Sequence, residues 1–191
     1  KIFKNERADA LLAKKEAGTM TSEEAENLKQ ELFKWVEYYK TEFKAKLFTP
    51  LSSNQKLVLM TRAEYGFLGY YDKNRRSPFE RYYVGGDGTT GTSGTYALTT
   101  VTLRGYDNGT LTPREQFYAG DYVQYAGNMY SKISFELRYP LMLEQAATIY
   151  VLTFAEAGNA WKNFKEFNPL NLKRSVGAGV RIFLPMLGLL G

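Results

Sequence analysis

The chain contains neither cysteine nor histidine among its 191 residues. These absences exclude cysteine nucleophiles, serine–histidine triads and histidine-ligated metal sites, and we expect no cofactor. No apolar run approaches the roughly 20 residues that a transmembrane helix needs, and the charged start from Lys1 to Arg7 lacks the pattern of a secretory signal peptide. The net charge of +5 is spread along the chain. No basic run is interleaved with aromatic residues, so we expect no nucleic-acid partner.

Aromatic residues, in contrast, are abundant, at 15% of the chain with 15 tyrosines. Such a composition fits β structure or a membrane interface. From Leu32 onward, apolar and charged residues alternate with a period of two. In the first run, one face carries Tyr39, Thr41, Phe43, Ala45 and Leu47, and the other carries Lys40, Glu42, Lys44 and Lys46. A helix would spread these charges around its whole circumference, so the pattern predicts a strand with one face suited to lipid.

The same alternation recurs further along the chain and defines the connections between strands. It covers residues 57–67, 129–139, 149–155 and 173–184, and we expect another strand from Gly188. The connections alternate between long and short, in the order 1–31, 50–53, 72–127, 140–145, 158–171 and 185–187. Short turns on one side and long loops on the other are typical of antiparallel up-and-down outer-membrane β-barrels. A soluble sandwich has no reason to sort its loops in this way.

The number of strands predicts part of a larger barrel. Five full strands cannot close a membrane barrel, which has about 8 strands or more, and an open edge cannot face lipid with unpaired backbone groups. Residues 1–31 differ from the rest, because they are polar and helical in pattern, with a capping box at Thr21 and Glu24. We therefore expect a helical extracellular loop segment at 1–31. Residues 32–191 would form a partial transmembrane β-barrel, with a long loop at 72–127 that enters the lumen.

One tetrapeptide in that long loop is unusual. Leu103, Arg104, Gly105 and Tyr106 place a cation and a glycine between two apolar side chains in a polar, glycine-rich stretch. Taken alone, Arg104 would be interpreted as one solvated cation among many. The strands on both sides of the loop favour the other interpretation, in which the loop folds back inside the barrel.

With the strands placed, the chain resembles the BamA family of outer-membrane assembly factors over residues 32–191. That family carries a Val/Ile-Arg-Gly-Phe/Tyr motif in its sixth extracellular loop, and residues 103–106 match it, with leucine in the first position. Residues 79–86, which end in Gly85 and Gly86, are similar to the aromatic and glycine segment that opens the same loop. Residues 135–140, 154–161 and 175–185 are similar to the family's strands 12, 13 and 14.

The resemblance implies the fold and the function. The fold would be a 16-stranded barrel in the outer membrane of a Gram-negative bacterium. The function would be the folding and insertion of other β-barrel proteins, without enzymatic chemistry, with unfolded clients and accessory assembly lipoproteins as partners. In the family, the motif arginine pairs with acids on the inner faces of strands 12 and 13. The matching positions are Glu136 and Glu156, which the alternation also places on the lumen side.

Several alternatives stay open at this point. The superfamily also contains polypeptide-translocating pores of the two-partner secretion type, and a passive porin or transporter or a soluble β-domain would share parts of the pattern. Residues 85–94 are rich in glycine but lack the Gly-Lys-Ser/Thr of a phosphate-binding loop. Glu136 and Glu156 have the chemistry of an acid–base pair, but a structural ion pair across neighbouring strands is the simpler interpretation.

Overall fold

The computed structural model describes residues 5–34, 36–72, 76–88, 97–116, 123–144, 147–184 and 188–190. The other residues lie outside the described part, including most of the glycine-rich stretch at 85–94 and the turn expected at 185–187. The described chain divides into two compact units, one made of residues 1–40 and 68–80 and the other of residues 41–67 and 81–191.

The first unit contains two short helices, α1 (Glu6–Glu16) and α2 (Ser22–Phe33). The Asn5 side chain caps α1 by accepting a hydrogen bond from the Ala8 amide at 3.1 Å. The predicted capping box of α2 is confirmed, because Thr21 and Glu24 each accept a bond from the other's backbone amide. Lys14 and Glu24 form an ion pair between the helices. Among the described residues, no helix has the length and apolar character needed to cross a membrane.

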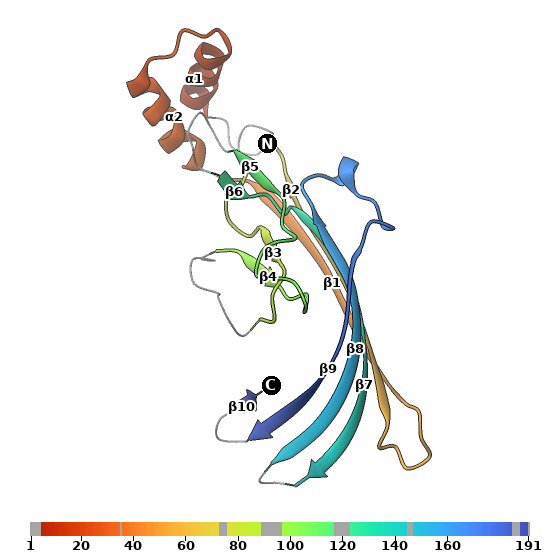
Figure 1. Ribbon diagram of the computed structural model, residues 1–191. Helices are drawn as coiled ribbons and strands as arrows, with labels where there is room; N and C mark the ends of the chain where they lie inside the picture. Colours follow the sequence, from red (N-terminus) through yellow and green to blue (C-terminus); the bar gives the residue numbers. More distant parts are fainter. Residues whose placement is uncertain are drawn as a thin grey trace. The chain divides into compact units, whose positions relative to one another are not determined.

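Most of the chain forms one six-stranded sheet with the order β1-β2-β7-β8-β9-β10 (Figure 1). Its strands are β1 (Tyr38–Pro50), β2 (Val58–Tyr70), β7 (Met129–Leu143), β8 (Thr148–Trp161), β9 (Lys173–Leu184) and β10 (Gly188–Leu190). The pairs from β2 through to β10 are antiparallel. The sheet is curved and unclosed, and its strands correspond to those that the period of two predicts.

Two strand ends differ from the sequence prediction. Strand β7 continues to Leu143, although a turn was expected from Pro140, and the register shifts between Pro140 and Met142. Pairing with β2 ends at Arg138, so Pro140 lies where a missing amide donor is tolerated. Strand β8 continues to Trp161, so the long connection after it starts at 162 rather than 158.

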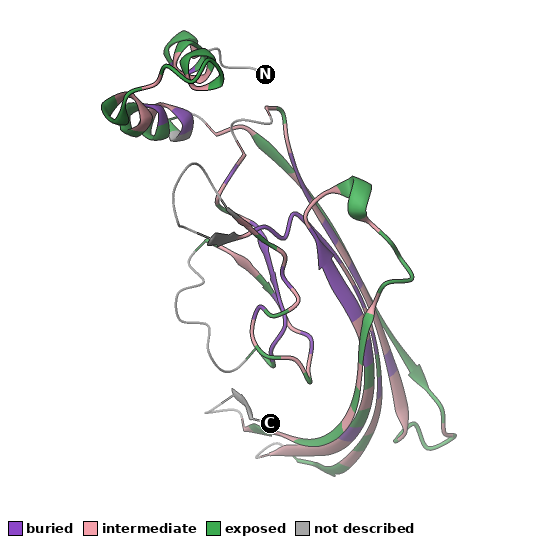
Figure 2. Cartoon of the chain, turned by 45° about the horizontal axis from the view of Figure 1, so that its top comes forward, coloured by how far each residue is buried: buried purple, intermediate pink, exposed green. Residues whose placement is uncertain are grey.

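The long loop lies on the concave side of the sheet (Figure 1). Its described residues contain four short strands, β3 (Tyr82–Val84), β4 (Thr99–Val101), β5 (Arg114–Gln116) and β6 (Val123–Tyr125). Strand β3 pairs in parallel with β4, and β5 pairs antiparallel with β6. Figure 2 shows that buried residues are concentrated in the loop and in the sheet that it faces. The core there includes Tyr82, whose ring lies 4.5 Å from that of Tyr130 on β7.

The sheet therefore has two distinct faces, which we call inward and outward. Inward side chains face the long loop, and outward side chains point away from it. Large apolar residues are exposed on the outward face, including Phe135, Tyr139, Val176 and Val180. The inward face instead buries charged residues, including Lys132, Glu136 and Glu156. This arrangement is the alternation of a strand between lipid and a polar lumen.

Candidate functional site

The tetrapeptide at residues 103–106 forms a tight turn that is tied to the glycine pair of the same loop. The Leu103 amide donates to the carbonyl of Gly86 at 3.0 Å, and the Gly86 amide donates to the carbonyl of Tyr106 at 2.9 Å. Gly86 has a φ of +87° and Gly105 a φ of +83°, which side-chain-bearing residues rarely adopt. Leu103 is fully buried. The turn therefore presents Arg104 in a fixed position.

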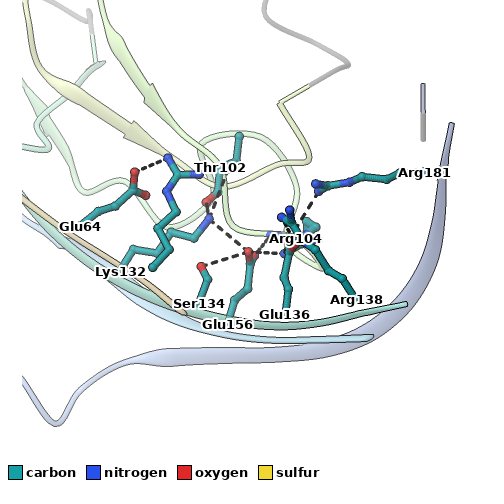
Figure 3. Close-up of polar contacts among 10 residues, drawn as sticks. Glu64, Thr102, Arg104, Lys132, Ser134, Glu136, Arg138, Glu156 and Arg181 are labelled. Atoms are coloured by element: carbon teal, nitrogen blue, oxygen red, sulfur yellow. Dashed lines mark hydrogen bonds and ion pairs between the residues drawn. The ribbon is translucent and has the colours of Figure 1, made fainter. Parts of the chain in front are cut away.

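Arg104 reaches two carboxylates on neighbouring strands (Figure 3). Its Nη2 atom donates to Glu136 on β7 and to Glu156 on β8, each at 2.6 Å, and its backbone amide donates to Glu156 at 3.0 Å. In the register of the sheet, Glu136 faces Phe154 and Glu156 faces Ser134, so the two acids are diagonal neighbours on one face. Diagonal residues stand about 7–8 Å apart, and their Cβ atoms somewhat less, which one guanidinium can bridge.

The environment of Arg104 favours its charged form. Its guanidinium carbon lies 3.7 Å from the centre of the Phe154 ring, a cation–π contact. Burial by itself lowers the pKa of Arg104, but the hydrogen bonds and negative charges of Glu156 and Glu136 outweigh burial and hold the pKa above its ordinary value. Each carboxylate is almost fully buried, so each needs such a partner to stay charged.

Lys132 on β7 adds a contact from the sheet to the residues before the motif. Its ammonium group donates to the carbonyl of Thr102 at 2.6 Å and to the Thr102 hydroxyl at 3.3 Å, and it lies 3.3 Å from Glu156. Ser134 donates a further bond to Glu156 at 3.2 Å. The alternation places Lys132 on the lumen side, but its partner in the loop was not predicted, because nothing in the sequence pairs it with Thr102.

The other end of the motif contacts β9. The Tyr106 hydroxyl donates to the backbone carbonyl of Arg174 at 2.8 Å. A Cβ atom on Gly105 would meet the Cβ of Ser175 at 3.2 Å, so the turn approaches this strand closely. The motif is thus held by β7, β8 and β9 together.

Positive charges outnumber the two acids in this cluster. Arg138 donates to Glu136 through Nε at 2.9 Å, and Arg181 on β9 lies 3.7 Å from the same carboxylate. With Arg104 and Lys132, four cations surround Glu136 and Glu156. Within the described part of the chain, no group of three or more acidic side chains is placed to hold a metal ion. The arrangement is suited to holding a loop in place.

The structure therefore brings together Arg104, Glu136 and Glu156, which the sequence singled out, and places Leu103, Gly105 and Tyr106 in the same turn. Gly85 and Gly86 lie behind this turn, where the Gly85 amide donates to the carbonyl of Val101 at 3.0 Å. Sequence reasoning missed Thr102 as a contact and gave no role to Lys132 or Arg138. The functional role of all these residues remains a prediction.

Comparison with known proteins agrees with this architecture. The model of the Omp85 superfamily domain matches residues 5–190. The outer membrane protein assembly factor BamA of Neisseria meningitidis serogroup B (strain ATCC BAA-335 / MC58) is 32% identical over 128 residues, which cover 66% of this chain and 14% of that protein. This match confirms the predicted resemblance to the BamA family.

A solved structure shows the same fold. The crystal structure of BamA from Haemophilus ducreyi lacking POTRA domains 1–3 matches with a TM-score of 0.57 and 19% identity, over 80% of this chain and 30% of that one. The chain thus spans less than a third of each of these two relatives. The sheet, its exposed apolar face and the match over residues 5–190 lead to one assignment: the chain belongs to the Omp85 superfamily and is part of an outer-membrane β-barrel.

Proposed function

We propose that this chain is the loop-bearing part of a barrel that folds and inserts other β-barrel proteins into the outer membrane. The observation that supports this function is the anchoring of the long loop through Arg104, Glu136 and Glu156 in a chain that resembles an assembly factor. The proposed partners are unfolded β-barrel clients, accessory assembly lipoproteins and the outer membrane itself.

The anchored loop would act by fixing the inside of the barrel. The loop is attached to the inward face of the sheet through Thr102, Arg104 and Tyr106, which contact β7, β8 and β9. A fixed loop sets the shape of the lumen and limits how far these strands can move. Clients would enter the bilayer through a seam elsewhere in the barrel, aided by local weakening of the membrane. The proposed activity makes and breaks no covalent bond.

The test is client insertion by the full-length protein in phospholipid vesicles, with folded client measured by its heat-modifiable gel mobility. Substituting Arg104→Ala leaves two buried carboxylates without their shared cation, so we expect insertion to slow by about tenfold or more. The insertion rate of Arg104→Lys should fall between those of the wild type and Arg104→Ala, since an ammonium group keeps the charge but cannot reproduce the guanidinium geometry. Arg7→Ala, on an exposed helical residue, removes the same charge and serves as the control.

Exchange of charges tests whether the contact is direct. Arg104→Glu alone places a third carboxylate beside Glu136 and Glu156 and should be the most damaging change. Adding Glu156→Arg should restore insertion only in part, because Glu136 still faces the new carboxylate and Lys132 lies beside the new cation. Equal insertion by the wild type and Arg104→Ala would refute the proposed role. Loss of polypeptide export with insertion unchanged would instead identify a secretion pore.

A further inference from the structure

The connection between β8 and β9 begins at Lys162, whose ammonium group lies 2.9 Å from Glu115 on β5 of the long loop. From Phe164 onward it packs on the opposite face of the sheet from that loop. We call residues 162–172 the outer-wall segment; it contains one 3-10 turn, η1 (Phe164–Glu166). The Phe167 ring lies 4.9 Å from Trp161 and 6.4 Å from Tyr65, and the Phe164 ring lies 6.2 Å from Phe67. In Figure 1, η1 lies on the convex side of the sheet, away from β3 to β6.

The register of the strands shows that these contacts are on the outward face. Tyr65 is opposite Ser131, and Phe67 is opposite Met129, while Lys132, the residue after Ser131, contacts the long loop on the inward face. Met129 and Trp161 are opposite each other and are buried, although they point outward. The Phe167 ring of the outer-wall segment packs against Trp161.

Two side-chain hydrogen bonds hold the ends of this segment against the sheet. The Asn128 amide group donates to the carbonyl of Lys162 at 3.0 Å, and the Asn159 amide group donates to the carbonyl of Asn171 at 2.8 Å. Together with the aromatic contacts, these bonds fix the segment on the outer wall instead of leaving it extended above the strands.

The segment lies where the apolar band of the outer wall ends. Cross-strand rows of outward residues are mostly apolar up to the row of Phe135, Ala155 and Val176, and their polar members are the threonines Thr61 and Thr153. The next row ends in Arg174, opposite Ala157, and the row beyond it contains the polar pair Ser131 and Asn159. Long loops lie on the extracellular side of such barrels, so this boundary faces the outer leaflet.

The exposed side chains at this boundary combine apolar and positive groups. Phe164 is 65% exposed and Leu170 is 85% exposed. Lys165 and Arg174 are also exposed, and neither has a carboxylate within ion-pair distance among the described residues. Glu166, the acid of the segment, accepts a hydrogen bond from Asn163 at 3.1 Å. Aromatic rings favour the membrane interface, and lysine and arginine near it attract anionic lipid.

We propose that the outer-wall segment and Arg174 bind anionic, phosphate-bearing lipids of the outer leaflet. Phe164 and Leu170 enter the boundary between head groups and acyl chains, and Lys165 and Arg174 contact lipid phosphates. The continuity of this surface with the lipid-facing band and its positive charge favour lipid over a protein partner. The proposal goes beyond client insertion and would hold equally for a secretion pore.

The test compares two lipids at one labelled position. This chain has no cysteine, so a fluorophore on Leu170→Cys is unique once any cysteine elsewhere in the full-length protein is replaced. The labelled protein is reconstituted in phosphatidylcholine vesicles containing 20% phosphatidylglycerol, with one of the two lipids carrying brominated acyl chains. Bromine quenches the label only when that lipid is adjacent. A second label on Val180→Cys reports ordinary lipid contact on the apolar band.

We expect quenching at position 170 by brominated phosphatidylglycerol to exceed, by about twofold or more, the value set by its mole fraction. At position 180 the two lipids should quench in proportion to their amounts. The double substitution Lys165→Gln with Arg174→Gln should abolish the excess at 170. The control double substitution, Lys29→Gln with Lys46→Gln, removes the same amount of charge elsewhere and should leave the excess quenching at 170 unchanged.

Three results would overturn the proposal. The first is proportional quenching at position 170, which means no preference for the anionic lipid. The second is quenching by aqueous acrylamide but by neither lipid, which places the segment in water. The third is protection from acrylamide and both lipids, which means that protein covers the segment.

Discussion

The inward and outward faces of β7 and β8 are built from alternating residues of the same strands, yet they bind their surroundings in opposite ways. Inward residues such as Lys132 and Glu156 are buried, and each contacts particular atoms of the long loop. Outward residues such as Phe135 and Val151 contribute apolar surface without directional bonds. We therefore expect chemical identity to matter on the inward face, and only apolar character to matter in the lipid-facing band of the outward face.

The largest loss of stability is expected for Glu156→Ala on the inward face. The Glu156 side chain is 2% exposed and accepts bonds from Arg104, so its loss leaves buried donors and cations without their partner. We expect a loss of about 3–5 kcal/mol in the free energy of unfolding. Urea unfolding of the full-length protein in vesicles measures it. Glu144→Ala, on an exposed turn residue, should change stability by less than about 0.5 kcal/mol.

A charge on the outward face should have the next largest effect. Ala178 lies opposite Thr153 in an apolar region of the lipid-facing band. Ala178→Arg should destabilise the barrel by about 2–4 kcal/mol, the cost of arginine near the middle of a bilayer. Ala178→Leu should be nearly neutral in the same urea assay. A large loss with leucine would show that the outward face also requires particular side chains.

Lys132→Met should have a smaller effect on the inward face. The change removes the bonds to Thr102, but Glu156 keeps its contacts with Arg104 and Ser134. We expect a loss of about 1–3 kcal/mol. Cleavage by trypsin within the long loop should become faster, which reports on the loop separately from the barrel. Unchanged cleavage would mean that Arg104 holds the loop without Lys132.

The smallest effect is expected in α2, which is not part of the sheet. Thr21→Ala removes the capping bond to the Glu24 amide and should cost about 1 kcal/mol locally. Amide hydrogen exchange in the first turn of α2 should become about fivefold faster, with the urea midpoint of the barrel unchanged. Ser22→Ala serves as the control. A shift in the barrel midpoint would show that the helices contribute to barrel stability.

Much of the sheet could be predicted because a strand in a lipid wall must alternate. That constraint placed Glu136 and Glu156 on the lumen side from the sequence alone. The inward direction of Arg104, however, came from the family resemblance, because a loop has no period that fixes where it points. The resemblance to the BamA family and the location in the outer membrane are confirmed.

Other features could not be predicted, for physical reasons. The contact between Lys132 and Thr102 depends on how the long loop folds in three dimensions. Phe164 and Phe167 belong to a connection without alternation, so nothing indicated that they would return to the outward face. The extension of β7 beyond Pro140 was missed because proline usually ends a strand within a sheet.

Because Arg104 pairs with one acid from each of two strands, its ion pairs also depend on the register in which those strands align during folding. Glu136 and Glu156 meet at Arg104 because β7 and β8 are aligned as observed. A slip of two residues would move one acid by about 7 Å along its strand and out of reach of the guanidinium. The buried charges would then be left unpaired, and the free-energy cost of burying them would disfavour the misaligned pairing of β7 and β8.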